Sequence, residues 1–251
     1  MKGLGALLKK EIMEQLRTYR VVVVGGIFLF FGVSTPLLLK FLPQIISLSG
    51  QQIPIDIPPP TAAQSLVEYA GTVGQVGVLM AVLMGMGGIS NEIQRGTAVM
   101  TLSKPVSKAA FANAKLLAMS LTFVVSLLVA SLFCFGYTGW LIGVGDLGRF
   151  GVLNLLAALF LVFSLAVTMM FSSLFSSSLA AGGVSMAVII GQAVISSVPV
   201  VGDFMPGKLL GWGNAVVQSS GKQYWWALAV ALVLTGFCLA LTQRSLKKKE
   251  M

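Results

Sequence analysis

Long apolar runs separated by short polar links dominate this chain. A transmembrane helix needs about 20 mainly apolar residues, and six stretches meet that requirement: residues 21–42, 66–90, 115–143, 151–175, 179–198 and 225–241. The pattern predicts an all-α polytopic membrane protein with six transmembrane helices. Only SSLFSSS divides the fourth stretch from the fifth. A re-entrant hairpin therefore stays open as an alternative to two full spans.

The first twenty residues have the period of an amphipathic helix. One half of the helical surface is apolar and is interrupted only by Glu11, and the other half carries the charges. The apolar half holds Leu4, Leu7, Leu8, Ile12 and Leu16, and the charged half holds Lys9, Lys10, Glu14, Arg17 and Arg20. We expect residues 1–20 to lie in the membrane interface, with cations toward anionic headgroups. A solvated charged tail is the alternative.

Composition and charge place the chain in a bilayer and orient it. At 56% hydrophobic and 10% charged residues, the chain has more apolar side chain than a soluble domain of 251 residues can bury. Lysine and arginine gather before the first span, in the link at 91–114, and after the last span. The positive-inside rule predicts that both termini and this link are cytoplasmic. The net charge of +9 then reflects topology, and no nucleic-acid partner is expected.

This orientation divides the chain into three parts. Residues 1–20 form the interfacial helix, residues 21–242 the six-helix transmembrane domain, and residues 243–251 a basic cytoplasmic tail. Within the second predicted span, small residues recur at Gly77, Ala81, Gly85 and Gly88. In lipid, small residues let helices approach closely. We expect this ridge to pack against another helix, either of the same chain or of a second copy.

The 91–114 link is longer than a simple turn requires. Gly96 can end the helix that leaves the membrane, and Thr97 can cap a short helix, AVMTL, at 98–102. Pro105 suits the first turn of the next helix, with Ser107 as an alternative cap. The pattern predicts a short transverse helix on the cytoplasmic surface, held between two spans. It could relay a push, or it could be only an interfacial helix stabilised by lipid headgroups.

Here the sequence resembles a family. The segment LLKKEIMEQLR before the first span, and NEIQRGTAVMTLSKPVSKAAFANAK after the second, are similar to the permease subunits of the type-2 ABC exporter family. In that family a glutamate, a glycine, a leucine, a Pro-Val-Ser-basic motif and a downstream lysine recur. The matching positions here are Glu92, Gly96, Leu102, residues 105–108 and Lys115.

The resemblance implies that the link docks onto a separate cytoplasmic ABC ATPase and relays its closure to the membrane helices. The residues expected to act in this coupling are Glu92, Gly96, Thr97, Leu102, Pro105 and Lys108. Gly96 and Pro105 would set the shape, and Leu102 would make the docking contact. Glu92 and Lys108 would make polar contacts.

Other chemistries find little support. The stretch GDFMPGKL has phosphate-loop spacing, but Leu209 stands where a Ser or Thr should hold magnesium. The chain has no histidine, and no pair of acidic residues suits acid–base catalysis. Cys134 and Cys238 fall near opposite ends of their spans, so neither a disulfide nor a metal site is indicated. We expect no enzyme activity and no cofactor on this chain, with ATP and Mg bound by the partner ATPase.

These observations predict the permease subunit of an ATP-driven ABC transporter, an exporter, in the plasma membrane of a bacterium or archaeon. Its expected partners are the ATPase, membrane lipids and a second permease copy, identical or different. One alternative is a non-transporting scaffold that recruits a cytoplasmic partner through the same link. Another is an ion-coupled carrier, which usually needs charged groups near the bilayer midplane, where this chain offers mainly Gln75 and Gln192. The cargo and the direction of transport stay open.

Overall fold

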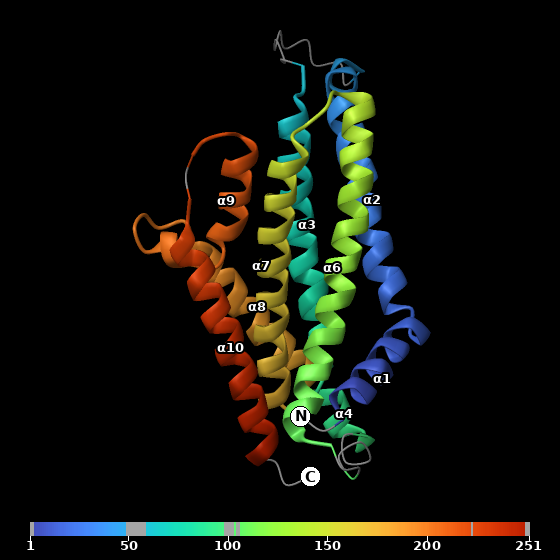
Figure 1. Ribbon diagram of the computed structural model, residues 1–251, viewed down its shortest axis with the longest axis vertical. Coiled ribbons are helices and arrows are strands. Elements are labelled where there is room, and N and C mark those ends of the chain that lie inside the picture. The colour runs from blue at the N-terminus through green and yellow to red at the C-terminus, as the bar shows by residue number, and fades with distance from the viewer. Residues whose placement is uncertain (1–2, 49–58, 98–102, 104–105, 222, 249–251) are drawn as a thin grey trace.

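The computed structural model describes residues 3–48, 59–97, 103, 106–221 and 223–248. These residues form a bundle of long helices (Figure 1) and contain no strand. The helices are α1 Leu4–Arg17, α2 Arg20–Leu48, α3 Ala62–Gly85, α4 Ser90–Gln94, α6 Lys108–Leu141, α7 Leu147–Leu174, α8 Ser178–Ile195, η1 Gly202–Phe204, α9 Lys208–Val217 and α10 Trp225–Lys248. In the described residues six helical segments are long and apolar enough to cross a membrane. The all-α, six-span prediction is confirmed.

Both chain ends lie at the same end of the bundle, together with α1, α4 and the start of α6 (Figure 1). We call this the terminal end. The connection from α6 to α7 and the top of α9 lie toward the opposite end. This arrangement puts the first residues of the chain beside the link that follows the second span.

Helix α7 is the centre of the bundle. It packs against α3, α6, α8, α9 and α10, and its Ser164, Thr168 and Ser172 side chains are completely buried. The Ser164 hydroxyl donates to the Phe160 carbonyl at 2.9 Å, and the Thr168 hydroxyl donates to the Ser164 carbonyl at 2.8 Å. Because these hydroxyls are satisfied within their own helix, they can be buried at small cost.

The predicted ridge of small residues packs within the chain. A Cβ atom on Gly77 would lie 2.8 Å from Leu161 Cδ2, and one on Gly85 would lie 2.9 Å from Thr168 Cγ2. Both partners are on α7, and Ala81 between them is fully buried. Gly88 lies instead against the end of the Met119 side chain of α6. The ridge therefore faces α7 and α6 of the same chain.

Several helix ends differ from those expected. Helix α2 continues through Pro43 to Leu48, α6 starts at Lys108, and α10 continues to Lys248. An apolar run marks only the part of a helix inside the hydrocarbon, and the polar turns beyond it stay helical without adding to the apolar signal. A proline such as Pro43 removes one backbone donor, which membrane helices tolerate.

The fourth and fifth stretches are two separate helices, each long and apolar enough to cross a membrane, which favours two spans over a re-entrant hairpin. Helix α7 has 28 residues and α8 has 18, and both qualify as membrane spans. Between them, Ser177 caps α8 by accepting a hydrogen bond from the Ala180 N–H at 3.4 Å. The segment between α8 and α10, where no helix was predicted, contains α9, whose Leu209 and Trp212 are buried.

Candidate functional site

Three helices bring buried charges together at the terminal end. The Lys115 ammonium of α6 lies 2.9 Å from Glu11 Oε2 of α1 and 2.6 Å from Glu92 Oε1 of α4. The side chains of Lys115, Glu11 and Glu92 are only 3%, 5% and 14% exposed. One lysine therefore joins the N-terminal helix to the start of the 91–114 link.

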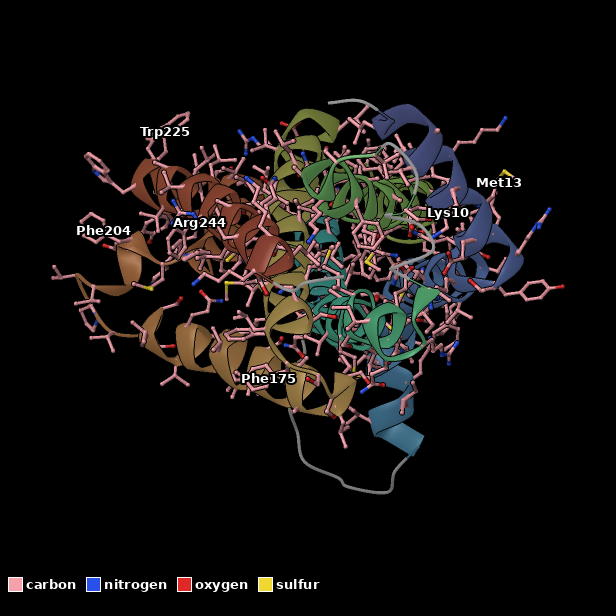
Figure 2. All side chains as sticks on the ribbon, turned by 90° about the horizontal axis from the view of Figure 1, so that it is seen from below. Lys10, Met13, Phe175, Phe204, Trp225 and Arg244 are labelled. Carbon is pink, nitrogen blue, oxygen red and sulfur yellow. The ribbon has the colours of Figure 1, made fainter. Side chains whose placement is uncertain are left out.

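Two further charges from α1 complete this group, which we call the inner charge cluster: Lys10, Glu11, Glu14, Glu92 and Lys115. The Lys10 ammonium lies 3.1 Å from Glu11, 3.6 Å from Glu14 and 3.8 Å from Glu92. Partial burial lowers the pKa of Lys10, but the three carboxylates outweigh this effect and raise it above its ordinary value. Figure 2 shows Lys10 on the side of α1 that faces the bundle, while Met13 points away. The Lys10 ammonium thus stays charged at neutral pH.

Helix α1 presents a partly polar face to the bundle. Leu7, Glu11 and Gln15 recur every four residues on one face, and all three are buried. The Gln15 Oε1 atom accepts a hydrogen bond from the Thr122 hydroxyl of α6. The apolar half of α1 is divided between protein and surface, because Leu7 is buried in the protein while Leu16 is 54% exposed. Part of the helix lies on α6 because Lys115 and Thr122 offer partners there.

Ser172 of α7 positions the segment that carries Glu92. Helix α3 ends at Gly85 and α4 begins at Ser90, and the backbone between them forms turns that interrupt the regular helix. The Ser172 hydroxyl accepts hydrogen bonds from the Ile89 and Ser90 N–H groups, both at 3.1 Å, and donates to the Met86 carbonyl at 2.8 Å. One side chain thus satisfies three backbone groups at the break. This fixes the direction in which α4 leaves α3.

Beyond α4 the backbone turns at Gly96. Its φ of 70° is left-handed, which glycine adopts without strain, and α4 ends just before it. The Thr97 hydroxyl donates to the Glu92 carbonyl at 3.3 Å. Gly96 therefore ends the helix as the sequence indicated, and Thr97 folds back onto the residue that pairs with Lys115.

The far side of the link begins helix α6 at Lys108. Ser107 is its N-cap, with its hydroxyl accepting from the Ala110 N–H at 3.0 Å. Of the two starts considered, the structure therefore has the Ser107 cap rather than a first turn at Pro105. The expected AVMTL helix at 98–102, with Leu102, and Pro105 itself lie outside the described residues.

The acidic members of the cluster are close enough to resemble a metal site. Carboxylate oxygens of Glu11, Glu14 and Glu92 lie within 4.8 Å of one another. However, the Lys115 and Lys10 ammonium groups lie among these oxygens, where a metal cation would otherwise balance them. The arrangement is an ion-pair network that ties α1, α4 and α6 together.

Sequence reasoning singled out Glu92 and Lys115 but missed their partner Glu11. The signal was present: Glu11 is the one residue that interrupts the apolar half of α1. A charge on the face of a helix that packs against the protein needs a partner. The 104 residues that separate Glu11 from Lys115 give no local pattern to identify which partner it finds.

The fold and the site define a class: a multi-pass, all-helical membrane protein whose N-terminal helix and second-span link are joined by buried ion pairs. Comparison with known families then identifies it. The family described as ABC-2 family transporter protein matches residues 5–212, and the chain belongs to this family. It is thus a transport subunit of the membrane. It is also similar to the uncharacterized transmembrane protein YxlG of Bacillus subtilis (strain 168), 24% identical over 199 residues and 77% of each chain.

Proposed function

We propose that this chain is the membrane permease of an ATP-driven exporter, and that the 91–114 link couples it to a separate cytoplasmic ATPase. The proposal rests chiefly on one observation: Lys115 pairs with both Glu11 and Glu92 in a buried site. A buried charge that loses a partner is strongly destabilised. The start of the link therefore cannot move alone, and a displacement there is carried to α1 and α6 together.

The anchoring of α4 supports the same role. On one side α4 is held by Lys115 of α6, and on the other by Ser172 of α7. The Gln94 side chain also donates to the Ser176 carbonyl in the link that follows α7. A docked ATPase that pushed on residues 97–107 would thus act on three membrane helices, α3, α6 and α7. Leu102 is the proposed docking contact, Gly96 and Pro105 set the shape, and Glu92 and Lys108 orient the link.

The terminal end is the cytoplasmic one in this proposal. It carries the basic residues Arg244, Lys247 and Lys248 of α10 as well as those of α1. The positive-inside rule favours that side. A second permease copy, identical or different, would complete the translocation path.

The docking role is tested with the full chain and its partner ATPase, identified from the neighbouring genes and purified together in lipid nanodiscs. Leu102→Asp should weaken co-purification or abolish stimulation of ATP hydrolysis. Val144→Asp is the matched control: Val144 is 85% exposed in the connection between α6 and α7, toward the opposite end. Unchanged assembly and hydrolysis in Leu102→Asp would refute the docking role. Assembly without any coupling of hydrolysis to transport would favour the scaffold function.

The orientation is tested by accessibility labelling in intact cells. Both native cysteines are buried, so a new cysteine reports its own position. Lys104→Cys should react only after the cytoplasmic side is opened, and Val144→Cys should react from outside. Labelling of Lys104→Cys from the outside would overturn both the topology and the ATPase coupling.

A further inference from the structure

A cavity of about 490 Å³ lies among α3, α7, α8 and the start of α9, away from the inner charge cluster. Its walls are mainly apolar and include Val78, Phe160, Met186 and Ile190. Its volume falls in the range of small-molecule sites, roughly 300–1,000 Å³. The cavity is bordered by a cation, Lys208, in the first turn of α9. Apolar walls with a cationic rim fit an amphipathic molecule with an anionic head.

Exposed aromatic residues lie near this rim. Phe204, Trp225 and Trp226 are 43%, 63% and 69% exposed, and Figure 2 shows Phe204 and Trp225 projecting from the outer edge of the bundle. Tryptophan and tyrosine gather at membrane–water interfaces. The Lys208 ammonium lies 5.7 Å from the centre of the Tyr224 ring. Lys208 thus has around it the kind of aromatic residues that form interfacial belts, with the apolar cavity beside it.

The charge of Lys208 is only weakly engaged by the protein. Its described ion-pair partner, Asp203, is 3.8 Å away with a side chain 52% exposed. Exposed pairs of this kind contribute little. A phosphate arriving at the cavity can therefore take the place of Asp203 at small cost.

The polar corner of the cavity adds a second feature. Gln192 Oε1 accepts a hydrogen bond from the Gly207 N–H at 3.0 Å, which ties α8 to the start of α9. The other end of this amide, Nε2, is buried and has no acceptor in the part of the chain that the structure describes. It lies next to Ser196 and Gly207, which line the cavity.

The cavity adjoins a face of α8 that is exposed to the surrounding bilayer, a source of amphipathic molecules with an anionic head. Val188, Ile190 and Val194 of α8 are 42%, 53% and 64% exposed, as expected of a lipid-facing helix. The cavity is next to this surface, since Ile190 belongs to both. We propose that the cavity binds one phospholipid of the surrounding membrane, with its phosphate at Lys208 and an acyl chain between α3 and α8. This site does not depend on the ATPase coupling proposed above.

The test measures lipid binding to the purified full chain in detergent by native mass spectrometry, without any ATPase. The probes are phosphatidylglycerol and diacylglycerol with the same acyl chains. Wild type should bind phosphatidylglycerol more tightly than diacylglycerol. Lys208→Gln should weaken the binding of phosphatidylglycerol about five-fold and remove this preference, because the attraction between one lysine and an anionic lipid changes the affinity by about that factor. Lys40→Gln, at another site, is the charge-matched control and should retain the preference.

A second pair of variants tests the apolar part. Met186→Trp fills the cavity and should remove saturable binding of both lipids, while Val188→Trp, on the same helix but not lining the cavity, should leave it unchanged. Melting temperatures in detergent verify that each variant is folded. Equal binding of the two lipids by wild type, an equal effect of Lys208→Gln and Lys40→Gln, or unchanged binding by Met186→Trp would each overturn the proposal.

Discussion

Replacing Lys115 with methionine is the sharpest test of the inner charge cluster. The substitution keeps an unbranched side chain of similar length but removes the ammonium group between two carboxylates. Glu11 and Glu92, with side chains 5% and 14% exposed, would then have the half-exposed Lys10 as their remaining ion-pair partner among the described residues. Removing one partner of a buried ion pair typically costs about 3–5 kcal/mol. We expect a loss of this order in the free energy of unfolding.

A second substitution distinguishes electrostatics from packing. In the Lys115→Met/Glu11→Leu double variant, one uncompensated carboxylate is gone, and Glu92 retains Lys10 at 3.8 Å. Replacing both members of a buried pair costs less than breaking it. The double variant should therefore be more stable than Lys115→Met alone, with an interaction free energy of roughly 1–3 kcal/mol.

The assay is reversible unfolding of the detergent-solubilised chain by sodium dodecyl sulfate, followed by circular dichroism and tryptophan fluorescence. Lys9→Met is the control, because Lys9 is exposed on α1, the helix that carries Glu11, and should change stability by less than about 0.5 kcal/mol. If Lys115→Met behaves like Lys9→Met, the ion pairs do not hold α1 and α4 to α6. The proposed transmission of a displacement from the link to α1 and α6 would then have no support.

Three further outcomes follow from the structure. Gly85→Ala should cost about 1–3 kcal/mol in the same unfolding assay, because its Cβ would lie 2.9 Å from a fully buried β-branched side chain of α7, whereas Gly71→Ala, with open space around it, should be neutral or stabilising. Ser172→Ala should cost about 1–3 kcal/mol for each buried N–H it deprives of an acceptor and speed hydrogen exchange of those two amides; Ser173→Ala, which loses only a bond to its own helix, should change neither. Because the folded-state pKa of Lys10 is raised above its ordinary 10.5, its stabilisation is fully present below that pH and is lost as the pH rises through the folded-state value. The stability difference between wild type and Lys10→Gln should thus be constant near neutral pH and shrink only in strong alkali; a decrease between about pH 6 and 9 would contradict this.

The helices that cross the membrane could be predicted from sequence because lipid imposes a length and an apolar composition on each one. Their polar ends could not, since the last turns of α2 and α10 lie beyond the apolar signal that marks a span. Helix α9 was missed for a different reason. Its ten residues include two glycines, so its local pattern is weak, and its stability comes from burying Trp212 and Leu209 against other helices.

The candidate site was predicted in part. The family resemblance drew attention to Glu92 and Lys115, and Gly96 ends α4 where a left-handed residue is needed. The pairing of Lys115 with Glu11 and the support of α4 by Ser172 depend on contacts between segments far apart in the chain. Such contacts leave no periodic trace, although a lone acidic residue on an otherwise apolar helix face is a sign that one exists.

The single hydroxyl of Ser172 has a mechanical consequence. The hydroxyl bonds to the backbone of Met86, Ile89 and Ser90, in the interruption between α3 and α4. Bending this segment would break these hydrogen bonds unless the end of α7 moves with it. The two must rotate as one joint. Since α7 contacts six other helices in the part of the chain that the structure describes, α4 among them, a small rotation at this joint would displace side chains on every one of them.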